Sequence, residues 1–346
     1  MDIPAVLELA RRHLLAAAAA YALEKTVALS EEFREEKYKA VRRLSLFNVE
    51  RAKVLNELEN KKIWYLPLKG IIIKDYYPKS AMREMGDNDI LFDSTKAEEV
   101  KNIMEGLGYT CKGYGASHHD VYSKPPYIKF EMHRRLTDKP EYREYFKNLK
   151  DKLIKDSNNG FGYHMTDEDF YIYLIWHLYN HYTLSGTGLR AVLDVYVFNR
   201  KFREKLDLEY LDTEFQKLDL NVFECKIRDF ANRLFSEQEL TKTELSELDF
   251  LVESGADGTK GFLWMYRLNN DDSGRAKTKY LLSRLFPSEE FVKENHPFVY
   301  RHKAVYPFWV IYRPIKGVVK HRKMMFNEIK RLKRFKKKEN TGQFNK

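Results

Sequence analysis

The stretch Arg83-Glu-Met-Gly-Asp87-Asn-Asp89-Ile-Leu-Phe92 decides how the rest of the chain is interpreted. Asp87 and Asp89 are separated by one residue and lead into an apolar run, which predicts a strand that points both carboxylates to the same side. Two carboxylates about 4 Å apart repel by roughly 4 kcal/mol at an effective dielectric constant of 20. We therefore expect a cation between them. Mg²⁺ is the simplest candidate, because one or two protein carboxylates bind it together with substrate phosphates and water.

A second acidic strand is expected downstream. The segment Tyr127-Ile-Lys-Phe-Glu131-Met-His133 alternates apolar and polar residues, a pattern that projects Glu131 and His133 from one face of a half-buried strand. If the two strands are neighbours, Glu131 adds a third carboxylate to the pair. His133 could act directly or orient a carboxylate through a hydrogen bond. The preceding segment, expected to be a loop, contains His118-His119-Asp120, which could hold a metal or a phosphate or be solvated.

A turn that could bind phosphate is expected upstream. Residues Ile63–Leu68 form a predicted strand that ends in Lys69-Gly70, and Ile71–Tyr77 form a predicted short helix. A glycine at such a turn allows backbone amides to approach a phosphate, and a lysine adds positive potential.

These motifs, in this order, resemble the uncharacterised nucleotidyltransferase family within the DNA polymerase beta-like superfamily. They are Leu68-Lys69-Gly70, Arg83 to Asp87-Asn-Asp89-Ile-Leu, Gly108-Tyr109 and Phe130-Glu131-Met-His133. The resemblance covers roughly residues 50–200. It implies an α+β fold with a small mixed sheet packed with helices. It also implies metal-dependent transfer of a nucleoside monophosphate from a nucleoside triphosphate (NTP) to a hydroxyl or similar acceptor, with release of pyrophosphate.

The resemblance also implies roles for individual residues. Asp87, Asp89 and Glu131 match the catalytic carboxylates that bind Mg²⁺, or alternatively Mn²⁺. Lys69-Gly70 occupies the phosphate-binding turn, where most of the superfamily has Gly-Ser, so the hydroxyl that would contact the triphosphate is missing.

Two further residues are candidates for nucleotide binding. His133 lies on the Glu131 strand, and Arg83 lies four residues before Asp87. Arg83 could equally form an outward-facing salt bridge.

Four regions are expected along the chain. They are N-terminal helices packing on the core (1–60), a catalytic core (61–137), a helical region that closes over substrate or nucleotide (138–312) and a basic tail (313–346). In the first region, the composition predicts two helices, Ala5–Lys25 and Ser30–Lys61.

The third region contains candidate substrate-binding residues. His177 and His181 lie four apart on one helix face, and Arg190 and Asp194 lie on the next helix. Histidines at this spacing could bind zinc, but the glutamate of a protease-type motif is absent. We favour a polar seam, His to Asp, that contacts nucleotide or acceptor.

The positive charge of the chain lies at its C-terminal end. Residues 313–346 contain 13 lysines and arginines against two glutamates, a net charge of +11, so that residues 1–312 sum to −1 within the total of +10. A nearly neutral body argues against a long cationic groove for nucleic acid. The tail could bind an anionic membrane surface or RNA, or it could be a solvated terminal helix.

Two cysteines and no membrane-spanning pattern favour a cytoplasmic protein, peripheral at the inner membrane surface if the tail binds lipid. No stable protein partner is inferred. Two other functions remain open: a nucleotide-binding protein that has lost catalysis, and an adaptor driven by the basic tail. We favour the enzyme because an adaptor would not need three carboxylates in this order.

Overall fold

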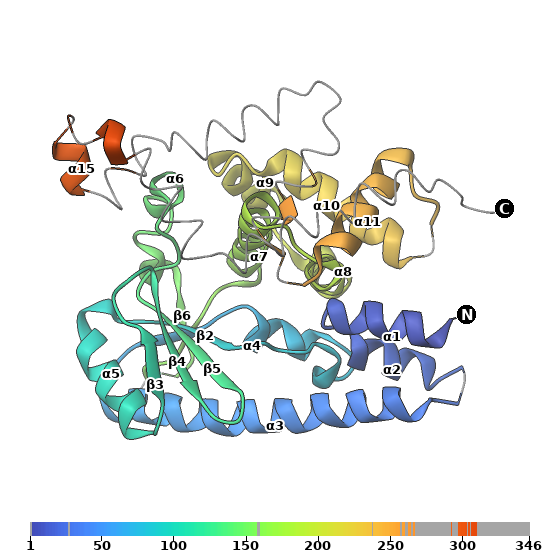
Figure 1. Cartoon of the computed structure of the whole chain (residues 1–346), viewed down its shortest axis with the longest axis horizontal. Coiled ribbons are helices and arrows are strands. Elements are labelled where there is room, and N and C mark those ends of the chain that lie inside the picture. Colours follow the sequence, from blue (N-terminus) through green and yellow to red (C-terminus); the bar gives the residue numbers. More distant parts are fainter. Residues whose placement is uncertain are drawn as a thin grey trace. The chain divides into compact units, whose positions relative to one another are not determined.

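The computed structural model describes residues 2–26, 28–157, 160–236 and 238–256, and positions 258–259, 262–263, 266, 292, 297–302, 304 and 306–309 (Figure 1). They belong to two compact units, one formed by residues 1–183 and 187–257 and the other by 184–186 and 258–346. The second unit contributes the short helix α15 (Pro297–Arg301). The predicted basic tail, 313–346, lies outside the described residues. Everything below concerns the first unit.

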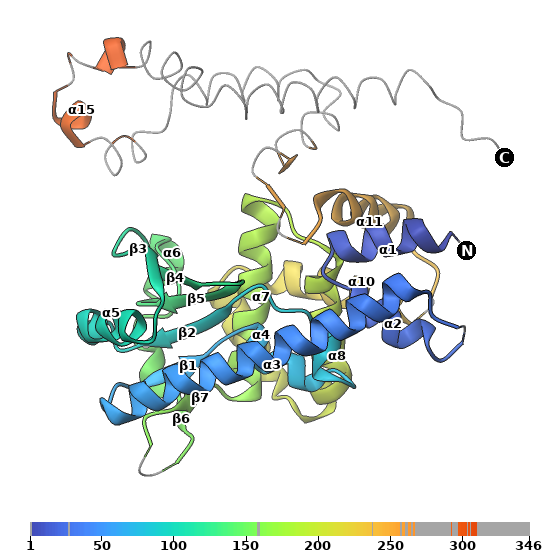
Figure 2. The same ribbon diagram turned by 60° about the horizontal axis from the view of Figure 1, so that its bottom comes forward.

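Five strands of the first unit form one mixed sheet (Figures 1 and 2). They are β1 (Tyr65–Pro67), β2 (Asn88–Phe92), β3 (Thr110–Gly113), β4 (His119–Lys124) and β5 (Ile128–His133). Their order across the sheet is β1-β2-β5-β4-β3, with β2 and β5 parallel and the other neighbours antiparallel. The predicted α+β fold with a small mixed sheet is confirmed. The expected loop around His118-His119-Asp120 is wrong in part, because His119 begins β4 and pairs with His133.

Helices make up most of the remaining described residues. They are α1 (Ile3–Arg12), α2 (Ala16–Leu23), α3 (Glu31–Asn60), α4 (Gly70–Ile73), α5 (Ala97–Gly106), α6 (Pro140–Arg143), α7 (Asp167–Leu184), α8 (Leu189–Phe202), α9 (Leu208–Lys217), α10 (Asn221–Phe235) and α11 (Lys242–Ser254). A small second sheet pairs β6 (Ile154–Lys155) with β7 (Tyr163–His164). Among the described residues, no helix combines the length and the apolar character needed to cross a bilayer.

The predicted single helix Ala5–Lys25 is wrong, because it is broken between α1 and α2. Leu14 at the break has a φ of 54°, a left-handed conformation that a helix cannot contain. The neighbouring His13 is fully buried, and its two ring nitrogens contact the Val252 carbonyl and the Leu189 amide. These contacts anchor the break to the C-terminal helices of the unit.

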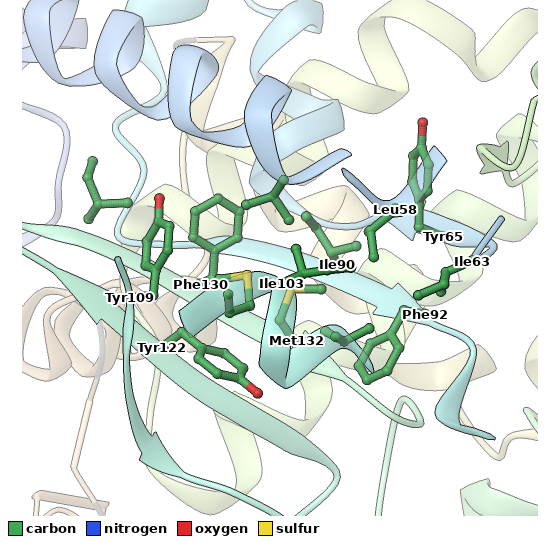
Figure 3. Close-up of a cluster of buried hydrophobic side chains, with 14 of the residues drawn as sticks. Leu58, Ile63, Tyr65, Ile90, Phe92, Ile103, Tyr109, Tyr122, Phe130 and Met132 are labelled. Atoms are coloured by element: carbon green, nitrogen blue, oxygen red, sulfur yellow. The ribbon is translucent and has the colours of Figure 1, made fainter. Parts of the chain in front are cut away.

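One face of the sheet carries the apolar core (Figure 3). Alternate residues of β2 and β5 point into it, together with apolar residues of α3 and α5: Ile90, Phe92, Phe130, Met132, Phe47, Val54, Leu58, Val100, Ile103 and Met104. In both ribbon views α3 runs along this side of the sheet, and α7 lies on the other (Figures 1 and 2). The strand period of two therefore leaves Asp89, Leu91, Glu131 and His133 for the α7 side.

Glu50 of α3 joins the helix to the sheet by polar contacts. The carboxylate is 5% exposed and accepts hydrogen bonds from Lys53 Nζ (2.6 Å), Tyr109 Oη (2.7 Å) and Lys124 Nζ (2.9 Å). Burial opposes ionisation, but these three donors outweigh it and hold the pKa of Glu50 at about 2.

We expect Glu50→Gln to lower the free energy of unfolding at pH 7 by about 1–3 kcal/mol, the range for buried hydrogen bonds to a charged group. A depressed folded-state pKa stabilises the fold above the ordinary value of 4.5, and this contribution is lost as pH falls toward 2. The difference between variant and wild type should therefore shrink below pH 4.5 in urea unfolding. Glu35→Gln, which removes an exposed pair with Lys39 on the same helix, is the control and should change stability by less than about 0.5 kcal/mol. If Glu50→Gln lowers the free energy of unfolding equally at pH 7 and pH 3, the ionised Glu50 carboxylate is not what stabilises the fold.

Candidate active site

The two acidic strands are neighbours. β2 and β5 run parallel, with Asp89 opposite Glu131 and Leu91 opposite His133. Donor atoms of Asp89, Glu131 and His133 lie within 4.8 Å of one another. The prediction that these strands bring Glu131 to the Asp-x-Asp motif is thus confirmed in its geometry, while the catalytic role of the three carboxylates stays a prediction.

Asp89 is the most enclosed of the three carboxylates, at 4% exposed. Its Oδ1 accepts from Lys69 Nζ at 2.8 Å and lies 2.9 Å from His133 Nε2. Burial by itself would favour the protonated acid, but Lys69 and His133 hold the pKa of Asp89 well below its usual range. Asp89 is therefore an anion bracketed by two nitrogen donors.

Lys129 lies between the other two carboxylates. Its Nζ is 3.3 Å from Asp87 Oδ2 and 2.5 Å from Glu131 Oε1. Burial and the negative charges of Asp89 and Glu131 raise the pKa of Asp87 to about 6, against the opposing effect of Lys69 and Lys129. The site thus holds more negative charge than its lysines balance. Sequence reasoning missed Lys129, although its place two residues before Glu131 on an alternating strand puts it on the same face.

The turn before α4 is followed by a shorter helix than predicted, and its backbone has one unusual residue. The predicted helix Ile71–Tyr77 is a four-residue α4 followed by a 3-10 turn at Lys74–Tyr76, too short to present a strong helix dipole. The left-handed φ, 48°, belongs to Lys69 and not to Gly70. A Cβ on Gly70 would lie 2.5 Å from Arg83 Nη1. Gly70 is therefore required by the guanidinium packed against it.

Arg83 is engaged by a carboxylate of α8. Arg83 Nη2 donates to Asp194 Oδ2 at 2.9 Å, and Tyr77 Oη donates to Asp194 Oδ1 at 2.7 Å. Both charged side chains are at least 90% buried, so the alternative of an outward-facing salt bridge is wrong. The role of Arg83 in nucleotide binding stays a prediction. Arg190 donates to the backbone carbonyl of Glu84 at 2.9 Å.

The four predicted substrate-binding residues do not form one seam. His177 lies beside the carboxylates: burial, Lys69 and His181 hold its pKa well below the usual value. His181 Nε2 is 3.1 Å from His177 Nε2. Asp194, in contrast, pairs with Arg83 and Tyr77. These contacts differ from the predicted contact between a histidine and Asp194. Sequence reasoning also missed Tyr173, one helical turn before His177, whose pKa burial and the site's carboxylates raise.

A known protein family matches most of the chain. The profile of a family described as an uncharacterised nucleotidyltransferase matches residues 1–236, about two thirds of the chain. The chain belongs to this nucleotidyltransferase family. The match includes both acidic strands, the Lys69-Gly70 turn and helices α7 and α8. No curated protein and no solved structure matches the chain.

A cavity of about 480 Å³ lies beyond the ends of β2 and β5; its lining includes Leu91 and Arg134 but none of the three carboxylates. One wall is Leu91, two residues beyond Asp89 on the same face of β2 and opposite His133. Five basic side chains and one acid line the cavity with an indole: Arg134, Arg135, Arg143, Lys147, Lys150, Asp93 and Trp64. Its opening is therefore suited to an anionic molecule.

Proposed function

We propose that this protein is a metal-dependent nucleotidyltransferase of the DNA polymerase beta-like superfamily. It would transfer a nucleoside monophosphate from an NTP to an acceptor hydroxyl and release pyrophosphate. The observation that carries the proposal is the convergence of three carboxylates: Asp89 of β2 and Glu131 of the adjacent β5 lie opposite each other, and Asp87, which directly precedes β2, shares Lys129 with Glu131. Membership of the nucleotidyltransferase family supports it.

The donor set fits Mg²⁺. Carboxylate oxygens are the ligands this hard cation prefers, and substrate phosphates complete its coordination. Three carboxylates share the site with only two contacting lysines, Lys69 and Lys129. Burial, together with the charges of Asp89 and Glu131, raises the pKa of Asp87. Asp87, Asp89 and Glu131 would hold the ion or ions. When bound, these neutralise triphosphate charge and lower the pKa of the acceptor hydroxyl.

The chain's own residues have separate tasks in this scheme. The acceptor oxygen attacks the α phosphorus while the bond from that phosphorus to the pyrophosphate oxygen breaks. Lys69 keeps Asp89 ionised, and His133 fixes its orientation from the other side. Lys129 adds positive charge where the triphosphate must approach. The charges of Lys69 and Asp89 act on both Tyr173 and His177 of α7, which places these two side chains near the site.

We propose further that the acceptor is anionic and binds in the basic cavity. Arg143 and Lys150 are exposed at its rim, and Lys150 lies over the Trp64 ring at 5.2 Å. This arrangement can bind a phosphate or carboxylate beside a planar group.

We expect Arg143→Glu/Lys150→Glu to raise the KM for the acceptor at least tenfold and to leave the KM for NTP and kcat within about threefold, because these side chains contact no reacting atom. Lys112→Glu, an exposed lysine on the edge strand β3, is the matched control. An unchanged acceptor KM would remove the cavity from the proposal but leave transfer intact.

The direct test of the proposed function is incubation with each of the four labelled NTPs, Mg²⁺ and fractionated extract, followed by mass analysis of the product. We expect one component to gain the mass of a nucleoside monophosphate, and pyrophosphate to appear in equal amount. A catalytically degenerate nucleotide-binding protein is the second candidate, favoured by Lys69 and Lys129 already contacting all three carboxylates. It predicts NTP binding without a covalent product.

The adaptor function depends on residues 313–346, which lie outside the described residues. It stays a separate prediction: deletion of 316–346 would abolish function while Asp89→Ala would not. The enzyme function predicts that Asp89→Ala abolishes activity.

A further inference from the structure

Three histidines gather beside the carboxylates, and two of them, His118 and His119, have no part in the scheme above. His118 precedes β4, His119 begins β4, and His133 ends β5 directly opposite His119. One ring nitrogen of each lies within 4.8 Å of those of the other two. The ring centroids of His119 and His133 are 5.1 Å apart, and those of His118 and His119 are 4.5 Å apart.

Each imidazole has a carboxylate near one of its nitrogens. His118 Nδ1 lies 3.3 Å from Asp138 Oδ2, His119 Nε2 lies 3.7 Å from Glu131 Oε2, and His133 Nε2 lies 2.9 Å from Asp89 Oδ1. Asp138 is in turn held by Arg135. Metal-binding histidines commonly donate one ring N–H to a carboxylate, which fixes the tautomer and leaves the other nitrogen unprotonated for the metal.

Of the remaining nitrogens, that of His133 has no hydrogen-bond partner among the described residues, and those of His118 and His119 contact each other. His133 is 3% exposed, and its Nδ1 has no hydrogen-bond partner among the described residues. If Nε2–H is donated to Asp89, this buried Nδ1 carries an unshared electron pair. His118 Nε2 and His119 Nδ1 face each other at 3.1 Å. Two ligands of a tetrahedral zinc ion are separated by about 3.3 Å, given Zn–N bonds of about 2.0–2.1 Å.

We infer that His118, His119 and His133 form a binding site for a borderline divalent transition ion of the Zn²⁺ class. Three imidazoles at one point suit Zn²⁺ rather than Mg²⁺, which prefers oxygen ligands. The site is distinct from the carboxylate site in its donor atoms and does not depend on nucleotidyl transfer.

Such an ion would hold the neighbouring ends of two strands in place. It would join the start of β4 to the end of β5, the strand that carries Glu131, and it would place positive charge beside the triphosphate. It would also hold His133 between the ion and Asp89.

Zn²⁺ binding to the metal-stripped full chain tests the site. In the presence of millimolar Mg²⁺, we expect about one Zn²⁺ per chain by elemental analysis, a raised melting temperature, and an X-ray absorption spectrum with imidazole outer-shell scattering. His118→Asn/His119→Gln should bind at least about 100-fold more weakly. His164→Gln is the matched control, because His164 also pairs with an aspartate, Asp156, but lies on β7.

Two further variants make the result decisive. Asp138→Asn, at a half-exposed carboxylate, should weaken Zn²⁺ binding about 10–100-fold by loosening His118, and it keeps the test valid if the double variant does not fold. Asp87→Asn should leave Zn²⁺ binding unchanged while removing the response to Mg²⁺. Unchanged Zn²⁺ binding in His118→Asn/His119→Gln, or its loss in His177→Gln instead, would overturn the inference.

Discussion

Asp87→Asn is expected to lower kcat by about 10³-fold while the protein keeps its fold. The carboxylate is a proposed ligand of the catalytic ion, whose charge stabilisation is worth several kcal/mol, and each 1.36 kcal/mol corresponds to about tenfold in rate. The fold should not suffer. The raised pKa of Asp87 means that its ionised form is disfavoured in the folded chain, so a neutral amide of the same shape relieves repulsion with Asp89 and Glu131.

The melting temperature distinguishes the loss of a metal ligand from a loss of folded structure in Asp87→Asn. Without added metal, Asp87→Asn should melt at the wild-type temperature or above it, and added Mg²⁺ should stabilise the wild type but not the variant. Asp229→Asn, at an exposed carboxylate of α10 that pairs with Arg228, is the control and should change neither turnover nor the response to Mg²⁺. Wild-type turnover in a folded Asp87→Asn protein would refute the proposed function.

Asp194→Asn is expected to lower the free energy of unfolding by about 3–5 kcal/mol, the range for removing one partner of a buried ion pair. The change leaves the Arg83 guanidinium, 10% exposed, without a charged partner. The double variant Arg83→Met/Asp194→Leu should recover much of the loss, because apolar residues of similar volume can replace a buried pair. Chemical denaturation of Arg83→Met, Asp194→Leu and the double variant gives the coupling energy.

The double variant also decides the role predicted for Arg83. If the pair is only structural, the folded double variant binds NTP as the wild type does. A loss of NTP affinity at preserved stability would instead place Arg83 at the nucleotide. Additive losses in the two single variants would show that the pair does not act as a unit.

The sequence was sufficient for the strand pair at the centre of the molecule. The alternation of apolar and polar residues along Ile128–His133 shows which side chains face the core, and the apolar run after Asp89 locates β2. Because successive side chains of a strand point to opposite faces, each residue can then be assigned to one face. The inference that Glu131 joins Asp89 then needed only that the two strands be neighbours. Their register, Asp89 opposite Glu131, confirms it.

Contacts between distant segments could not be predicted in the same way. The break at Leu14 depends on His13 reaching residues more than 170 positions away. The partner of Arg83 is set by how α8 packs, and no local pattern encodes it. The left-handed φ at Lys69 has no signal either, because the adjacent glycine is the residue that normally adopts it. Such features follow from tertiary packing.

Alternate residues of β2 face the apolar core and the acidic site, and this limits which sequence changes the strand tolerates. Ile90 and Phe92 belong to the apolar core, and Asp89 and Leu91 belong to the opposite face. Substituting one of them alters one face only. Inserting or deleting a single residue inside the strand would exchange the two sets, carrying a carboxylate into the hydrocarbon interior and an isoleucine into the acidic site. Length changes in this gene segment should therefore be far more damaging than point replacements.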